Sequence, residues 1–254
     1  MFKFFKEIIS SVKEGIAEGI EEANAEEAQE KSNKDKAALA QRELEQKLIQ
    51  NTPFQESFGT ALGAPFRSIL FGDWVSVFDK NKDSEKYPIH LYTFGEYQGK
   101  EERFSDFKMA LKRDFGIVDT ESCKKTLADF FALAQISTEH TLLEAIEGNA
   151  NSIFWNLEKQ GANALYAAVL SHIITASTDV QFIQKEEALR LLEKINEFVR
   201  PNYSNWEDFG VDFLIGEQNI GLNNALGRKF LKKTVGFLQD KKGSPWKNLE
   251  WFEI

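Results

Sequence analysis

The feature that most constrains this chain is a long helical pattern between residues 154 and 176. Apolar and small side chains recur there every three or four residues, which is the period of one face of an α-helix. Glycine and alanine on that face allow a neighbouring helix to approach closely. We therefore expect the other helices to pack around this one. The positions predicted to be buried are Phe154, Leu157, Gly161, Leu165, Ala168, Val169, His172, Ile173 and Ala176.

Two more helices are predicted after the central one. Residues 188–199 are amphipathic, and Pro201 is predicted to terminate their helix. Ser204 and Glu207 have the spacing of a capping box, in which each side chain accepts a hydrogen bond from the amide of the other residue. The helix that begins there is predicted to end at Gly216. The side chains predicted to be buried on it are Trp206, Phe209 and Phe213.

Helices are also predicted upstream. Gly116 is expected to end one helix and Asp119 to cap the next, and a shorter helix is expected over residues 138–147, with His140 at its surface. Cys123 lies on an apolar face and is predicted to be a packed small hydrophobe rather than a nucleophile. The predicted buried residues are Phe104, Phe107, Leu111 and Phe115 in the first helix, and Cys123, Leu127, Phe130, Phe131 and Ala134 in the second.

Residues 54–74 are punctuated by glycine and predict short helical pieces. Only residues 74–78 and 89–94 resemble strands, and they predict at most a small β-hairpin. The predicted fold class is therefore mainly α, a compact helical domain preceded by an N-terminal helical arm. The residues of 54–74 expected in the core are Phe54, Phe58, Leu62, Phe66, Ile69 and Leu70.

The segment between the two strand candidates resembles the start of a calcium-binding loop. Asp79, Asn81 and Asp83 match its first three ligand positions. Ser84 stands where the loop needs glycine, and His90 stands where it needs a bidentate carboxylate. We therefore predict a solvated turn and no metal site.

The N-terminal part of the chain has a different composition. Residues 2–20 carry apolar side chains at helical spacing flanked by lysines, and three hypotheses compete for them: docking on the body, pairing with a partner helix, or lying on a membrane surface. Residues 21–50 are mostly Ala, Glu, Gln and Lys, which is typical of a solvated arm. The break at Thr52-Pro53 divides the chain into residues 1–51, an amphipathic helix and acidic arm, and residues 52–254, a helical domain.

Composition excludes several classes of function. The 254 residues are 42% hydrophobic and carry a formal net charge of −9, which disfavours a nucleic-acid partner because phosphate contacts need a basic surface. One cysteine cannot form an internal disulfide. No apolar run is long enough for a membrane span, and residues 2–20 are too interrupted by charge for a signal peptide. The expected compartment is the cytoplasm.

The C-terminal part is basic. Its Pro245-Trp246 and Trp251-Phe252 pairs are expected to fold back onto the body, and its charge contrasts with the acidic arm. The cationic residues after Asn223 are Arg228, Lys229, Lys232, Lys233, Lys241, Lys242 and Lys247.

No sequence motif for catalysis, phosphate binding, dinucleotide binding or zinc binding is present, so no cofactor is predicted. His172 lies in the buried stripe of the central helix and is most simply a core histidine. If the chain were an enzyme, its site would lie in a cleft between helices. The candidate catalytic residues there are Lys159, His172, Glu207 and Asp208, near Asn156.

Three pieces of residues 111–216 carry a resemblance to a known family. They are Phe115-Gly116-Ile117 with Asp119; Phe154-Trp155-Asn156-Leu157-Glu158-Lys159; and Ile183–Ala188 with Tyr203–Gly210 and Phe213–Gly216. This region resembles the bacterial family called domain of unknown function 1266. The resemblance implies a mostly helical protein without a defined activity.

The second piece departs from the family pattern, because Asn156 replaces an acid and Lys159 replaces an arginine. A structural role for Asn156 fits better than a catalytic one, since its amide can still form hydrogen bonds. The residues to which the resemblance assigns a structural role are Trp155, Asn156, Ser204, Trp206, Glu207, Phe209, Gly210 and Gly216.

Three functional hypotheses follow. The first is a non-enzymatic interaction protein whose protein partner is basic, such as an antagonist or immunity protein against a basic toxin or effector. The alternatives are an enzyme of undefined reaction with its site in the helical cleft, and a peripheral membrane protein that uses residues 2–20. The sequence leaves the oligomeric state undefined.

Overall fold

The structure is a computed structural model of the 254-residue chain. It describes residues 29, 31–37, 39–40, 43–70, 89–95, 101–133, 161–220 and 225–252. All regular structure in these ranges is helical, which confirms the mainly α prediction. The chain divides into two compact units, residues 1–47 and residues 48–254, and the elements below belong to the second.

The α-helices of the second unit are α2 (Phe54–Leu62), α3 (Ala64–Leu70), α5 (Glu101–Phe115), α6 (Thr120–Leu133), α8 (Ala162–Asp179), α9 (Lys185–Val199), α10 (Trp206–Ile220), α11 (Ala225–Asp240) and α12 (Pro245–Asn248). Two short 3₁₀ helices, η1 (Ile89–Leu91) and η2 (Arg200–Asn202), lie between them. In the part of the chain that the structure describes, no helix is both long and apolar enough to cross a lipid bilayer.

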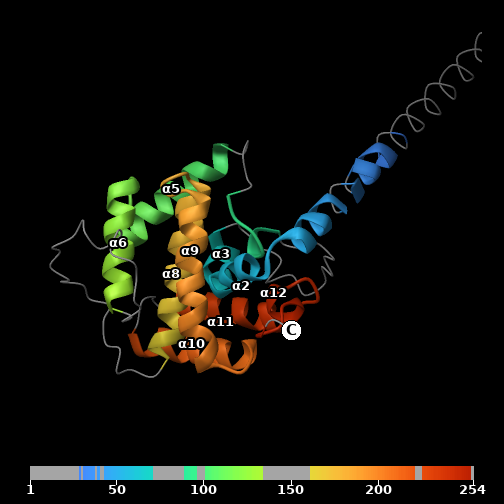
Figure 1. Ribbon diagram of the computed structural model, residues 1–254. Coiled ribbons are helices and arrows are strands. Elements are labelled where there is room, and N and C mark those ends of the chain that lie inside the picture. Colours follow the sequence, from blue (N-terminus) through green and yellow to red (C-terminus); the bar gives the residue numbers. More distant parts are fainter. Residues whose placement is uncertain are drawn as a thin grey trace, which may run out of the picture. The chain divides into compact units, whose positions relative to one another are not determined.

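Helix α8 is the centre of this unit, as its sequence pattern predicts. Asn163 is its one exposed residue. The helix contacts α2, α3, α5, α6, α9 and α10, and Figure 1 shows α9 running alongside it. Because α8 is surrounded by other helices, it needs apolar or small residues on all its sides rather than on one face.

The N-terminal end of α8 differs from the prediction. Gly161 was expected inside the helix, but its φ of 84° is left-handed, and the helix begins only at Ala162. A Cβ atom at Gly161 would collide with the backbone of Asp212 and Gly216 on α10. Gly161 therefore allows the turn before α8 to lie directly against the backbone of α10.

The prediction that Gly216 ends its helix is wrong for the same reason. Helix α10 continues to Ile220, and Gly216 lies within it, where a Cβ atom would meet the carbonyl group of Gly161. The absence of a side chain serves the close contact between α8 and α10 rather than a helix end. The expected close approach to small residues of the central helix is thereby confirmed.

The predicted cap of α10 is displaced by one residue. Trp206 is the first helical residue, and the Asn205 side chain accepts a hydrogen bond from the Asp208 amide at 2.8 Å. Asn205 is therefore the N-cap, and the predicted box between Ser204 and Glu207 is wrong. An asparagine next to a serine offers two competing caps, and the buried position of Trp206 selects Asn205.

Two other local predictions are confirmed. Gly116 ends α5 with a φ of 70°, and its amide donates to the Lys112 carbonyl. The Asp119 carboxylate accepts from the Ser122 amide at 2.8 Å and caps α6.

Cys123 is buried in α6, where desolvation raises the pKa of its thiol to about 11. A thiol with that pKa is not a nucleophile at neutral pH.

The predicted strand at residues 89–94 is wrong. Its first residues form η1, and the segment is held by a buried ion pair between Arg67 and Asp179, with 2.9 Å between Nη1 and Oδ2. Arg67 Nε donates to the His90 carbonyl at 2.8 Å, and the Gly95 amide donates to Asp179 at 2.6 Å. These two side chains satisfy backbone groups that a neighbouring strand would otherwise pair.

Helix α3 places this arginine in the core. Arg67 has no exposed surface, whereas Ile69, which was expected to be buried, is 37% exposed. The helix thus turns a charged residue inward, because Asp179 at the end of α8 neutralises it. The expected burial of Phe58 and Leu62 on α2 is confirmed.

The C-terminal segment folds back as expected. Trp246 and Trp251 are 5% and 4% exposed, and Figure 1 shows the end of the chain beside α12. Phe252 is an exception to that prediction, since it is 53% exposed. The predictions that lie outside the described residues concern residues 2–20, 71–88 and 134–160, which include the Asp79–Asp83 loop, His140, Trp155, Asn156 and Lys159.

Candidate functional site

A cluster of aromatic rings joins the C-terminal segment to α2 and α10. The Trp206 indole stacks on that of Trp246, with 5.5 Å between ring centroids and 16° between ring planes. The rings of Trp251 and Trp206 pack edge to face, with 4.8 Å between their centroids. The ring centroid of Phe58 lies within 5.0 Å of those of Trp206 and Trp251. Such pairs add about 0.5–1.5 kcal/mol each beyond the apolar area that they bury.

Each of these indoles also donates its N–H to a backbone carbonyl. Trp206 Nε1 donates to Leu249 at 2.7 Å, and Trp246 Nε1 donates to Ala61 at 2.9 Å. Trp251 Nε1 donates to Arg200 at 3.1 Å. The rings are therefore fixed in position as well as buried.

Gly210 allows this packing. A Cβ atom there would lie 2.9 Å from the Trp246 ring and 2.8 Å from Gln239 Nε2. Phe209, the residue before it, is fully buried with its ring edge toward Trp246, at 5.8 Å between centroids. The Trp206, Phe209 and Gly210 positions therefore have a packing role in this structure.

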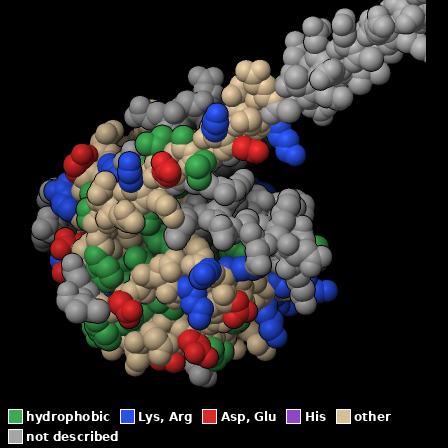
Figure 2. Space-filling model, turned by 90° about the vertical axis from the view of Figure 1, so that its right-hand side faces the viewer, with side chains coloured by type: hydrophobic (Ala, Val, Ile, Leu, Met, Phe, Trp, Pro, Cys, Tyr) green, Lys and Arg blue, Asp and Glu red, His purple; other side chains and the backbone are tan. Residues whose placement is uncertain are grey.

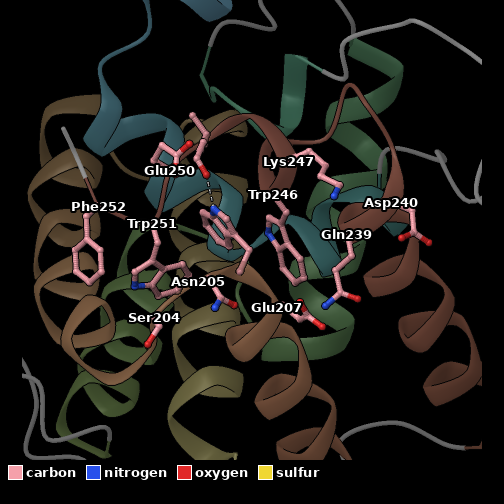
Figure 3. A pocket seen from close by; sticks show the side chains of 12 residues that line it. Ser204, Asn205, Glu207, Gln239, Asp240, Trp246, Lys247, Glu250, Trp251 and Phe252 are labelled. Carbon is pink, nitrogen blue, oxygen red and sulfur yellow. Dashed lines mark hydrogen bonds between the residues drawn. The ribbon is translucent and has the colours of Figure 1, made fainter.

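A pocket of about 600 Å³ opens over these indoles, and we call it the indole pocket. Its walls come from the start of α10, the end of α11, and the segment from α12 to Phe252. In Figure 3, Glu250 lies on one side of Trp246, and Asp240 lies on the other, with Glu207 below. The lining residues are Ser204, Asn205, Trp206, Glu207, Gln239, Asp240, Trp246, Lys247, Leu249, Glu250, Trp251 and Phe252.

The charged groups of the indole pocket are mostly acidic and exposed. Three carboxylates, those of Glu207, Asp240 and Glu250, and the ammonium group of Lys247 are among its lining groups. Among the residues that the structure describes, none of these four side chains forms an ion pair or a hydrogen bond. The three carboxylates are therefore available to a cation from outside the chain.

A second concavity of about 580 Å³ lies on the adjacent side of α10, and we call it the α10 groove. It shares Ser204 and Glu207 with the indole pocket. The Tyr203 hydroxyl donates to Asp212 Oδ2 at 2.6 Å, and burial together with this carboxylate raises the pKa of Tyr203 far above its ordinary value. The groove is lined by Asn163, Asn202, Tyr203, Ser204, Glu207, Asp208, Val211, Asp212 and Ile215.

His172 lies in neither concavity. Its ring is 5.6 Å from that of Phe66 and 6.2 Å from that of Phe115, between centroids. Burial, and to a smaller extent the charge of Arg67, lowers the pKa of His172 to about 3. The imidazole is therefore neutral, and its environment is that of a core histidine.

The helical-cleft site that the enzyme hypothesis requires is not assembled by the described residues. Glu207 and Asp208 are exposed at the start of α10, whereas His172 is buried in α8, and Lys159 lies outside the described ranges. Within those ranges, no group of three or more His, Cys, Asp or Glu side chains is arranged to hold a metal ion.

Of the charged residues of the indole pocket, only Glu207 is a candidate site residue from the sequence. Asp240, Lys247 and Glu250 belong to charge patterns that are ordinary on a solvated surface. The one available signal is the predicted return of Trp246 and Trp251 to the body, which brings the segment between them to α10.

Comparison with known proteins supports the family resemblance. A family model described as a protein of unknown function (DUF1266) matches residues 134–251. The match begins after the Phe115-Gly116-Ile117 element and extends through Trp251, so the resemblance reaches further toward the C-terminus than residues 111–216. It therefore includes every wall of the indole pocket except Phe252. No curated protein and no solved structure matches the chain.

Proposed function

We propose that this protein acts by binding a basic protein partner, and that the indole pocket receives a cationic side chain of that partner. The observation that carries the proposal is the set of Glu207, Asp240 and Glu250, which line a pocket over buried indoles and have no ion-pair partner among the described residues. A role as antagonist of a basic toxin or effector is the form of this function that the net charge of −9 favours.

The proposal depends on local charge rather than on a uniformly acidic surface. On the face drawn in Figure 2, Lys and Arg side chains are interspersed with Asp and Glu. The residues that line the indole pocket instead include three carboxylates and one ammonium group. A cation that enters the pocket would pair with these carboxylates, and over the face of an aromatic ring it would also gain a cation–π contact.

The test is a titration of the purified protein with a capped oligoarginine peptide, followed by calorimetry and tryptophan fluorescence. We expect binding that weakens as ionic strength rises, because salt screens exposed charges. The combined variant Glu207→Gln, Asp240→Asn and Glu250→Gln should weaken binding by about tenfold or more, at roughly 0.5 kcal/mol or more for each exposed charge pair.

The matched control is Asp106→Asn, Glu121→Gln and Glu193→Gln, which changes the net charge equally at exposed positions outside both concavities. Equal loss of binding in the two combined variants would contradict a role for the pocket. If the proposal holds, affinity capture from the native organism should recover a basic protein with the control variant and not with the pocket variant. Turnover of a small molecule that Asp208→Asn abolishes without changing the melting curve would favour the enzyme hypothesis instead.

A further inference from the structure

The wall of the α10 groove contains aliphatic side chains that are exposed or half-buried. Val211 is 51% exposed, and Ile215 is half-buried one helical turn further along. Glu207 precedes Val211 by four residues, so the three side chains form one stripe on α10. Asp208 and Asp212 form a second, acidic stripe beside it.

Helix stability alone does not explain the acidic residues that line the indole pocket and the α10 groove. Carboxylates in the first turn of a helix are favoured by the helix dipole, and this accounts for Glu207 and Asp208. It does not account for Asp240 and Glu250, which belong to other segments and line the indole pocket together with Glu207. Acidic side chains from three segments of the chain therefore line one pocket, which gives it a surface complementary to a cation.

The two concavities are adjacent, because Ser204 and Glu207 line both. We propose that they bind one peptide segment of the partner that carries both arginine and apolar side chains. An arginine side chain enters the indole pocket, and a neighbouring apolar side chain packs against Val211 and Ile215 in the α10 groove. This inference rests on the proposed function and specifies the chemistry of the partner.

Arginine suits the indole pocket better than lysine. A guanidinium is planar, can pair with a carboxylate through two hydrogen bonds, and stacks on aromatic rings. The neighbouring aromatic residues already hold one guanidinium, because Cζ of Arg200 lies 5.3 Å from the ring centroid of Phe54, 5.6 Å from that of Phe58 and 5.7 Å from that of Phe252. Phe252 also lines the pocket and is exposed on it.

The experiment uses the full-length protein and four capped peptides of equal length that alternate two residue types: arginine with leucine, arginine with serine, lysine with leucine, and glutamate with leucine. Affinities are measured by calorimetry at one ionic strength. We expect the arginine–leucine peptide to bind roughly fivefold or more tightly than either the arginine–serine or the lysine–leucine peptide, and the glutamate–leucine peptide not to bind.

Two substitutions separate the concavities. Val211→Ser should weaken binding of the arginine–leucine peptide roughly fivefold and leave binding of the arginine–serine peptide unchanged, because only the leucine side chains contact the apolar wall. Asp240→Asn should weaken both arginine peptides roughly threefold. The controls are Val118→Ser, whose valine is 52% exposed, and Glu193→Gln; neither residue lines the indole pocket or the α10 groove.

The outcomes distinguish this inference from the proposed function. Equal affinity for the arginine–leucine and arginine–serine peptides, with no effect of Val211→Ser, would overturn the inference and leave binding of a basic partner intact. Spermine binding as tightly as the arginine–leucine peptide would also overturn it, because a polyamine has no side chain for the groove. Failure of every basic peptide to bind would overturn both.

Discussion

His172 shows how a polar residue becomes part of the core of this protein. The ring lies near Phe66 and Phe115, and its Nδ1 has no hydrogen-bond partner among the described residues. A buried polar atom without a partner costs about 1–3 kcal/mol, and protonation of the ring would cost more. Arg67 and Asp179 show the opposite arrangement, because each buried charge there is neutralised by the other.

The stability of the protein should therefore depend on pH through His172. In the unfolded chain the imidazole has its ordinary pKa of 6.5, whereas in the folded protein the value is about 3. Between these values the unfolded chain binds more protons, so the free energy of unfolding falls as pH decreases, by at most about 1.4 kcal/mol per pH unit for one group. The stability contributed by the neutral ring is complete above pH 6.5.

We expect His172→Leu to remove this contribution. Between pH 6.5 and 4, the free energy of unfolding should then depend less steeply on pH, by an amount that corresponds to nearly one bound proton. At pH 7 the free energy of unfolding of the variant should differ from that of the parent by less than about 1.5 kcal/mol. The reason is that Nδ1 of the ring has no hydrogen-bond partner among the described residues, and the two side chains have similar volumes. Urea unfolding at several pH values measures both quantities. Parallel pH curves for parent and variant would show that His172 is not the responsible group.

The crossing of α8 and α10 is the element-scale feature that most depends on glycine. Gly161 and Gly216 meet backbone to backbone, so neither position has room for a methyl group. Another glycine in a helix, Gly236 in α11, has no atom within 4 Å of the position that a Cβ would occupy. Gly216 in α10 and Gly236 in α11 therefore offer a matched pair of glycine substitutions.

Gly216→Ala should destabilise the protein by more than about 2 kcal/mol, because the added methyl group must separate α10 from the turn at Gly161. Gly236→Ala should instead stabilise it by up to about 1 kcal/mol, because alanine has the higher helix propensity and meets nothing. Chemical denaturation of both variants checks the prediction. A stable Gly216→Ala protein would mean that the helices can separate at little cost.

At the scale of the whole molecule, the hydrophobic core lies entirely in the second unit among the described residues. Its earliest member is Ile49, which packs against the core from the helix that ends at Asn51. Thr52 then donates its hydroxyl to the Leu48 carbonyl at 2.7 Å. The division into residues 1–51 and 52–254 remains a prediction, and the last residues before Thr52 belong to the second unit.

A chain that begins at Leu48 should remain folded and melt in a single cooperative transition, with a midpoint close to that of the full chain. A chain that begins at Phe54 should be less stable by about 1 kcal/mol, because it loses the packing of Ile49. Circular dichroism and calorimetry measure the transitions. Loss of cooperative melting in the chain that begins at Leu48 would show that residues 1–47 are needed for folding.

The same pair of proteins addresses the membrane hypothesis for residues 2–20. Sedimentation with anionic liposomes by the full chain, but not by the chain that begins at Leu48, would support that hypothesis. Equal behaviour of the two proteins would leave docking and helix pairing as the alternatives.

The sequence alone determined the features that depend on interactions within a few residues of one another. The glycine that ends α5, the Asp119 cap of α6 and the buried face formed by Trp206, Phe209 and Phe213 could all be predicted, because a cap or a helical face involves neighbours within about one turn. The cap of α10 was displaced by one residue, since two adjacent residues can both act as caps.

Only the tertiary structure decided the features that join distant segments. Arg67 and Asp179 are 112 residues apart, and their ion-paired side chains form hydrogen bonds with the backbone of the segment that was predicted as a strand. The contact of Gly161 with Gly216 also joins distant segments, and so does the indole pocket, whose carboxylates come from three segments. A local pattern carries no record of its distant partner, because the contact forms only when the core brings the two segments together.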